Sequence, residues 1–402
     1  TPTPGVTVPA VWTDVVGQPD AVVTLARAAA DESSMTHAWL FTGPPGSGRS
    51  VAARAFATAL QCPQAGCGTC HECRTANSGA HADVTVVATE HVTLRVEDVR
   101  PLVQLAQQRP SQGRWRVIII EDADRLNETS GNLLLKAIEE PPPRTVWLLC
   151  APSPNDVLVT IRSRCRSVGL RIPPPEAVAE LLARRDGVDP TLAAFAARAA
   201  DCHIGLARRL ATDEGARIRR REVLRLPTQL SSVGTAVIAA GRLVEVAAEE
   251  AKSATTERDA AERSSLLRSL GAEGAATLPP AVRAQVRVLE ENQKRRATRA
   301  QRDVLDRALI DLLSLYRDVL VTQLGAVPAQ GDPGTGTGLV NAELRAEIDR
   351  LAAASPPEET LRRMDAIGRA RRQVAANVAP LLAIEALMVQ LRPRGAPRPP
   401  AG

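Results

Sequence analysis

The sequence predicts a parallel α/β domain followed by a region that is helical to its end. Short apolar runs alternate with stretches of helical periodicity in the first 170 residues, which is the pattern of a three-layer fold with helices on both faces of a parallel sheet. Beyond residue 175 only helical periodicity remains, notably over 282–324, and aromatic residues make up only 2% of the chain. A length of 402 residues is enough for two or three domains.

Each element of the α/β part follows from a local pattern. Apolar residues at helical spacing predict a helix that begins near Asp20, which we expect to be its N-cap. Residues 117–120 are all β-branched and should form a central strand buried on both faces. Asn127 is expected to cap a helix that the prolines at 141–143 end. The remaining expected strands are 38–41, 83–87 and 146–150, and a further helix is expected around 96–106.

The stretch Leu40–Ser50 has the spacing of a Walker A phosphate-binding loop. An apolar run, a glycine-rich turn and a helix follow one another, so that backbone N–H groups and a helix N-terminus can converge on one anion. The usual lysine is replaced by Arg49, which keeps the charge on a wider planar group. The loop residues that we expect to bind nucleotide are Gly43, Pro44, Pro45, Gly46, Ser47, Gly48, Arg49 and Ser50, the last through Mg²⁺.

Two acidic residues follow the central strand. Glu121 is expected to hold Mg²⁺ through water, and Asp122 to orient the attacking water of an NTPase. The usual order is Asp then Glu, and the shorter Asp122 would reach the γ-phosphate region less well. We therefore interpret Asp122 as a weakened catalytic acid.

Four cysteines, Cys62, Cys67, Cys70 and Cys73, follow the loop helix with the spacing C-x4-C-x2-C-x2-C. Four thiolates at such spacing can enclose one tetrahedral zinc ion, which would be structural because no coordination position stays open. The alternative is that they are free thiols. Cys150, Cys165 and Cys202 are isolated and are expected to be small core residues.

Two single arginines and one basic cluster each have two possible interpretations. Arg164 lies in the basic stretch Ile161–Arg166 and is either a surface residue or an arginine finger that acts on a neighbouring subunit. Arg208, in a later helix, is either solvated or directed at a γ-phosphate in cis. The cluster Lys294–Arg302 is either a solvated face matched by Glu290, Glu291, Asp303 and Asp306 or a nucleic-acid contact.

The bulk composition is that of a globular protein. Net charge is +5 and the pI is about 9.0, which permits nucleic-acid contact without indicating it. No apolar run reaches about 18 residues and no signal-peptide pattern is present at the start, so we expect a cytoplasmic protein.

These motifs together resemble the AAA+ clamp-loader subunits of the bacterial replicative polymerase, DNA polymerase III. The resemblance covers residues 15 to about 212 and rests on Val16–Gln18, Thr36–Ser50, the cysteines after the loop helix, Asn132–Pro142 and Ser163–Cys165. It implies that Arg164 is the trans-acting finger and that the helical remainder is the collar that holds five subunits in a ring. Richness in alanine and arginine suggests an actinobacterial type of genome.

Departures from the motor subunits of this family favour the delta-prime, or stator, type. Motor subunits usually have Lys in the loop, Asp-Glu on the strand and Thr-Thr after the following strand. This chain has Arg49, Glu121–Asp122 and Ala151–Pro154 there. The resemblance implies weak or no ATPase activity, ATP or ADP with Mg²⁺ at a degenerate site, gamma/tau and delta subunits as partners in a heteropentamer, and loading of the beta sliding clamp onto primer-template DNA.

Two alternatives stay open at this point: a working gamma/tau-like ATPase motor, and a zinc-containing nucleic-acid-binding protein with a vestigial loop. The expected domains are an AAA+ core at 1–172 with its zinc module at 62–73, a small helical lid at 173–213, and an all-α collar at 214–402. Within the collar we expect a flexible linker at 327–338 and a disordered tail from 392.

Overall fold

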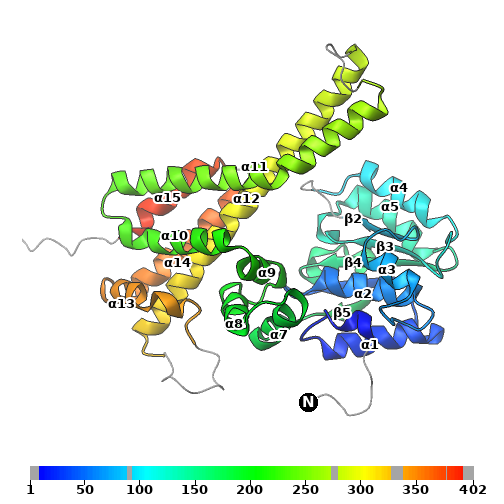
Figure 1. The fold of residues 1–402 in the computed structure, drawn as a ribbon, viewed down its shortest axis with the longest axis horizontal. Coiled ribbons are helices and arrows are strands. Elements are labelled where there is room, and N and C mark those ends of the chain that lie inside the picture. The colour runs from blue at the N-terminus through cyan, green and yellow to red at the C-terminus, as the bar shows by residue number, and fades with distance from the viewer. Residues whose placement is uncertain (1–8, 88–92, 273–278, 327–337, 377, 393–402) are drawn as a thin grey trace, which may run out of the picture. The chain divides into compact units, whose positions relative to one another are not determined.

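The computed structural model describes residues 9–87, 93–272, 279–326, 338–376 and 378–392. The chain divides into two compact units, Thr1–Asp213 and Glu214–Gly402 (Figure 1). The predicted linker and tail lie outside the described residues, apart from Gly338 and Arg392. Separation of the first unit into a core and a lid domain stays a prediction.

A parallel sheet organises the first unit, as predicted, and it has five strands. The strand order is β2-β3-β4-β1-β5. Register pairs Leu40 of β1 with Leu149 of β4 and with Ser167 of β5. The strands are β1 Ala38–Thr42, β2 Val84–Val87, β3 Arg116–Ile120, β4 Thr145–Ala151 and β5 Arg166–Gly169. The sequence analysis missed β5.

Alternate strand residues serve two separate cores, which explains why β1, β3 and β4 are apolar throughout. Trp39 and Phe41 face a core that includes α1 Pro19–Ala30 and α2 Arg49–Gln61. Ala38 and Leu40 face a second core with helices α4 Val96–Ala106, α5 Glu128–Glu139 and α6 Val159–Arg162. The unit therefore has the predicted three layers, with helices on both faces of the sheet.

The helix boundaries agree with the predicted signals with one exception. Asn127 caps α5, and its side chain accepts a hydrogen bond from the Ser130 N–H at 2.9 Å. The prediction that Asp20 caps α1 is wrong, because Pro19 already occupies the first helical position and Gln18 is the N-cap residue. The unit ends with three short helices, as expected: α7 Pro175–Asp186, α8 Pro190–Ala199 and α9 Ile204–Thr212.

The second unit is all helical over its described residues. Its core contains Leu305, Leu309, Leu312 and Tyr316 of α12, which pack with residues of α11, α14 and α15. The helices are α10 Glu214–Gln229, α11 Val233–Ser269, α12 Pro280–Gln323, α13 Arg345–Ala353, α14 Pro357–Ala375 and α15 Pro380–Leu391. Among the helices described, none combines the length and the apolar character that crossing a membrane requires.

Candidate nucleotide and metal sites

The phosphate loop connects β1 to α2 at the carboxyl edge of the sheet. Gly46 has φ +88° and Gly48 has φ +84°, which is the left-handed region that glycine tolerates and other residues rarely adopt. Gly48 is also the N-cap of α2, so the first N–H groups of that helix open toward the loop. The backbone therefore has the form that anion binding requires.

Arg49 turns back onto its own loop. Its Nη1 donates a hydrogen bond to the carbonyl oxygen of Gly43 at 2.7 Å. A phosphate bound in the loop would compete with that carbonyl for the guanidinium. A lysine ammonium is compact and makes single-point contacts, whereas the wider fork of Arg49 spans the loop.

Ser47 is the buried polar group of the loop. It is 1% exposed, and its Oγ has no hydrogen-bond partner within the described part of the chain. Gln18 holds the same segment from outside the loop, since its Nε2 donates to the carbonyl oxygens of Ser47 at 3.2 Å and Arg171 at 2.5 Å. The unpartnered hydroxyl and the open N–H groups show that the loop is compatible with a bound anion.

The acidic residues after β3 are engaged with cations of the same unit. Arg54 of α2 donates to Glu121 Oε1 through Nε at 3.1 Å and Nη2 at 3.0 Å. Asp122 lies 3.7 Å from the Arg125 guanidinium. Sequence reasoning missed Asp124: burial raises the pKa of its carboxyl, the charge of Asp122 raises it further, and Arg125 and Arg49 oppose the shift.

The position after β4 contributes only backbone to the loop. The Pro152 carbonyl oxygen accepts a hydrogen bond from the Gly43 N–H at 3.2 Å. The Ser153 hydroxyl is used locally, accepting from the Asn155 N–H at 3.2 Å. Two threonine hydroxyls would otherwise be available here for a γ-phosphate or its water.

Helix α9 lies against the loop with its N-terminus. A Cβ placed on Gly46 would come within 2.9 Å of His203 Cα, and His203 caps α9 through its Nδ1, which accepts from the Leu206 N–H at 3.3 Å. The sequence analysis did not identify His203. Arg208, on the same helix, is 58% exposed and forms an ion pair with Asp186 at 2.9 Å, so a nucleotide would have to compete with that carboxylate for it.

Arg164 follows the C-cap of α6 and is 40% exposed. Its Nη2 lies 2.6 Å from Glu139 Oε1, at the end of α5, and its Nη1 donates to the Thr160 carbonyl oxygen at 2.9 Å. These contacts hold the guanidinium on the surface of the unit. Glu139 belongs to the stretch 132–142 that the sequence analysis singled out without assigning it a role.

The four cysteines after α2 come together as a compact cluster. Their Sγ atoms all lie within 4.8 Å of one another, with Cys62 at 3.6 Å from Cys67 and 3.8 Å from Cys70. Four sulfurs at about 2.3 Å from a central tetrahedral ion would be about 3.8 Å apart, so this spacing fits a metal ion.

Backbone N–H groups surround the sulfurs of the cluster. The Cys67 N–H donates to Cys62 Sγ at 3.3 Å, and the Gly68 N–H donates to Cys73 Sγ at the same distance. N–H donors lower the pKa of Cys67 to about 6, whereas burial raises that of Cys73. N–H groups that donate to a sulfur stabilise its thiolate form, which is the form that binds a metal ion. The cluster can hold one metal ion.

The other cysteines lie outside this cluster. Cys150 and Cys202 are buried and Cys165 is half-buried. Burial raises the pKa of Cys150 and Cys165 to about 12 and that of Cys202 to about 11, which keeps all three as neutral thiols.

Comparisons with known proteins agree with this geometry. Residues 17–174 match the family model described as "DNA polymerase III, delta subunit". Over this stretch, the chain is similar to clamp-loader subunits of bacterial DNA polymerase III. The match includes the phosphate loop, the cysteine cluster and Arg164.

Individual relatives have two different subunit names. The gamma/tau subunit of DNA polymerase III from Mycobacterium tuberculosis H37Rv is 36% identical over 44% of this chain and 31% of its own length. The delta' subunit from Pseudomonas aeruginosa is 36% identical over 37% of this chain and 47% of its own length. The matched stretch therefore spans less than half of either relative.

A solved structure also resembles the chain. The alignment with the DNA polymerase III gamma subunit-related protein of Thermotoga maritima covers 92% of this chain and 98% of that chain, with 15% identity and a TM-score of 0.43.

Proposed function

We propose that this chain is the delta-prime, or stator, subunit of a bacterial DNA polymerase III clamp loader. The match of residues 17–174 to the model described as "DNA polymerase III, delta subunit" supports the general role of a clamp-loader subunit. The observation that carries the stator role is an asymmetry: Arg164 is held at the surface, while Arg49 and Glu121 on the chain's own nucleotide side are bound to other groups.

The proposed role requires little or no ATP turnover at the chain's own loop. Arg49 replaces lysine and bonds to the Gly43 carbonyl, Glu121 is neutralised by Arg54, and no threonine pair follows β4. ATP or ADP with Mg²⁺ could still be retained by Gly43–Ser50, with Glu121 and Arg208 nearby in the role of weak ligands. Asp122 would be at most a weakened catalytic acid.

Arg164 would act on the nucleotide of a neighbouring gamma/tau subunit. A guanidinium delivered across a subunit interface stabilises the charge that develops on transferring phosphoryl oxygens, and this contributes about 10³- to 10⁵-fold to the rate in comparable systems. Glu139 would hold the side chain extended before the interface forms. The proposed assembly is a heteropentamer with gamma/tau and delta subunits that loads the beta clamp onto primer-template DNA.

The metal of the cysteine cluster is proposed to be Zn²⁺. Four thiolates in a tetrahedral arrangement suit zinc, and a closed set of protein ligands leaves no position for catalysis. The ion would fix the loop 62–73 between α2 and α3, His71–Asn77.

A gamma/tau-like motor is the second candidate, because several relatives have that name and Arg49 keeps a positive charge at the lysine position. The two candidates differ in which site hydrolyses ATP. In a loader reconstituted with motor and delta subunits, Arg49→Ala should leave hydrolysis stimulated by primed DNA and clamp unchanged if the chain is a stator. A loss of that hydrolysis would support the motor, provided that assembly by size-exclusion chromatography is intact.

A further inference from the structure

The second unit carries a helical arm, formed by residues 252–269 of α11 and 280–302 of α12. The core of the unit uses α11 up to Ala247 and α12 from Leu305 onward. Beyond these residues the two helices run together past the ends of α14 and α15 (Figure 1). The 23 residues of α12 in the arm correspond to about 35 Å of helix that contributes nothing to that core.

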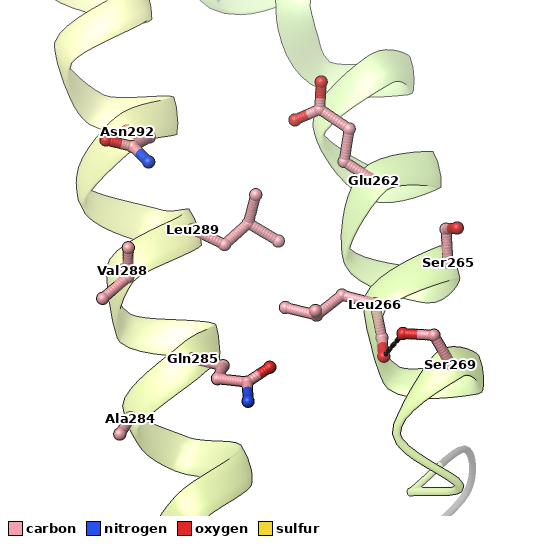
Figure 2. Close-up of a pocket in the computed structure, with 9 residues that line it drawn as sticks. All are labelled: Glu262, Ser265, Leu266, Ser269, Ala284, Gln285, Val288, Leu289 and Asn292. Carbon is pink, nitrogen blue, oxygen red and sulfur yellow. Dashed lines mark hydrogen bonds between the residues drawn. The ribbon is translucent and has the colours of Figure 1, made fainter. Parts of the chain in front are cut away.

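The inner face of the arm binds its two helices to each other. Figure 2 shows Leu266 and Leu289 pointing toward one another across a pocket of about 750 Å³. Arg296 Nη2 lies 2.9 Å from Asp259 and also pairs with Glu262. Hydrogen bonds from Arg296 lower the pKa of Glu262 to about 2. Asp259 and Glu262 of α11 are therefore used inside the arm, where they pair with Arg296 of the basic cluster.

The arm concentrates the positive charge of the chain. Residues 258–302, which include most of the arm together with the sequence 270–279 between its two helices, contain ten Lys and Arg against five Asp and Glu, a formal net charge of +5. This equals the net charge of all 402 residues, so the rest of the chain has equal numbers of acidic and basic residues. Positive charge concentrated on one extended element is the electrostatic pattern of a nucleic-acid contact.

Four cations on α12 face away from α11: Arg283, Arg287, Lys294 and Arg295. All four are exposed, and within the described part of the chain none of them forms an ion pair or a side-chain hydrogen bond. An α-helix turns by about 100° per residue, so Arg283, Arg287 and Lys294 lie within about 40° of one another around the axis of α12. Leu289, which points toward α11 (Figure 2), lies more than about 90° from all three around the same axis. The row extends over about 18 Å of helix. We name these four residues the outer basic row.

The chemistry of the row indicates its ligand. Three of the four residues are arginines, whose forked donors match phosphate oxygens. No aromatic residue occurs between 248 and 304, so the arm lacks the rings on which unpaired bases stack. A protein partner would usually be anchored by aromatic or apolar side chains at the centre of the contact, which the row also lacks.

We propose that the outer basic row of the α11–α12 arm binds the phosphate backbone of duplex DNA without reading its sequence. This goes beyond the proposed function, because a stator that acts through Arg164 needs no DNA contact of its own. Arg296 has a different role, because its ion pairs with Asp259 and Glu262 join the two helices of the arm.

The test compares the 402-residue chain with a variant in which Arg283, Arg287, Lys294 and Arg295 are all changed to Gln. Binding of a fluorescein-labelled duplex of arbitrary sequence is measured by anisotropy between 50 and 200 mM salt. A matched control removes the same charge from exposed positions elsewhere in the second unit, namely Arg221, Arg242, Arg350 and Arg372, each changed to Gln.

Loss of up to four phosphate contacts should reduce the magnitude of the slope of log affinity against log salt by about 3 to 4. Between 50 and 200 mM salt, the affinity of the variant should therefore fall about 100-fold less than that of the wild type. The control variant should retain the wild-type slope. Equal binding by the wild type and the outer-row variant would overturn the proposal. Competition by poly-glutamate as effective as that by duplex at equal charge would also overturn it, since the surface would then recognise acidic protein. Circular dichroism of each variant verifies folding.

Discussion

At the scale of single residues, the phosphate loop combines a retained backbone with altered side chains. Gly46 and Gly48 have the dihedral angles that the motif requires, whereas Arg49 bonds to the loop itself. The glycine pattern could be interpreted from sequence because only glycine adopts such angles without strain. The direction of the Arg49 side chain could not, because it depends on which carbonyl lies within reach.

Gly46→Ala should destabilise the chain more than Gly79→Ala does. Both glycines have positive φ, +88° and +75°, so both variants incur a backbone cost of about 1–2 kcal/mol. Only at Gly46 does the new Cβ meet the His203 backbone, at 2.9 Å, whereas nothing lies within 4 Å at Gly79. Thermal unfolding should show the larger loss for Gly46→Ala. Equal losses would show that α9 does not press on the loop.

The buried carboxylate of Asp83 should make the free energy of unfolding depend on pH. It is fully buried and accepts N–H hydrogen bonds from Ser111 at 2.8 Å and from Gln112 and Gly113 at 2.7 Å, besides a 2.9 Å ion pair with Arg116. Burial alone would raise its pKa, but these N–H donors outweigh burial and lower it from 3.8 to about 2. Because the folded-state pKa is depressed, the contribution is present above about pH 4 and is lost as pH falls toward 2. It amounts to about 2 kcal/mol.

Asp83→Asn should abolish this acid-dependent part of the free energy of unfolding. At neutral pH the variant should also lose about 3–5 kcal/mol, because Arg116 is left buried without its counter-charge. Urea unfolding at pH 6, 4 and 3 measures both effects. Asp156→Asn, at an exposed position, is the control and should resemble the wild type. The idea fails if Asp83→Asn and the wild type lose stability in parallel on acidification.

At the scale of elements, buried strands with continuous apolar runs could be recognised from sequence and β5 could not. Arg166–Gly169 contains a single buried residue, Val168, and lies at the edge of the sheet beside β1. An edge strand needs neither an apolar run nor alternation over many residues, so its pairing with β1 comes from tertiary structure. The contact of Arg171 also comes from tertiary structure and could not be predicted from sequence: its N–H donates to Gln18 Oε1 at 3.1 Å.

The cysteine cluster is the feature whose residue spacing in the sequence corresponds most directly to its geometry in the structure. Two C-x2-C steps predicted that four thiolates would meet, and the cluster has that form. The contacts that surround it were not predictable: Gly66 accepts a hydrogen bond from the Val11 N–H at 3.3 Å, which joins the module to residues far earlier in the chain.

Cys70→Ser should remove the metal while preserving the local helix cap. Cys70 is the N-cap of α3 and its Sγ accepts from the Cys73 N–H at 3.4 Å, a role that a serine hydroxyl can perform. We expect zinc content, measured by mass spectrometry of the metal, to fall well below one ion per chain. The unfolding temperature should fall to that of the wild type treated with a chelator.

The control for this variant is Cys165→Ser, which changes a half-buried thiol outside the cluster and should retain the ion. Full zinc occupancy in Cys70→Ser would mean that the four sulfurs are not the ligands.

At the scale of the whole molecule, the sequence predicted a nucleotide-binding type of core followed by helices. It did not predict that α11 and α12 extend beyond their own core, because amphipathic periodicity continues along the arm as it does in the collar. The ion-pair partners of the arginines could not be predicted from sequence either, because each partner lies on another element of the fold. The pairs are Arg164 with Glu139, Arg208 with Asp186, and Arg296 with Asp259. Pattern identifies charge, whereas tertiary structure determines which charges stay available.

The proposed stator role requires that Arg164 of this chain act on the nucleotide of a neighbouring subunit. The most direct measurement is kcat for ATP hydrolysis, stimulated by primed DNA and clamp, in a loader reconstituted with Arg164→Ala. The matched control is Arg162→Ala, an arginine two residues earlier whose guanidinium donates to the Pro154 carbonyl oxygen and to Asn155 Oδ1. We predict that Arg164→Ala removes the contribution of the neighbouring site, with its rate reduced about 10³-fold or more. Arg162→Ala should leave kcat unchanged, and both complexes should assemble. An unchanged kcat in the assembled Arg164→Ala loader would contradict the account.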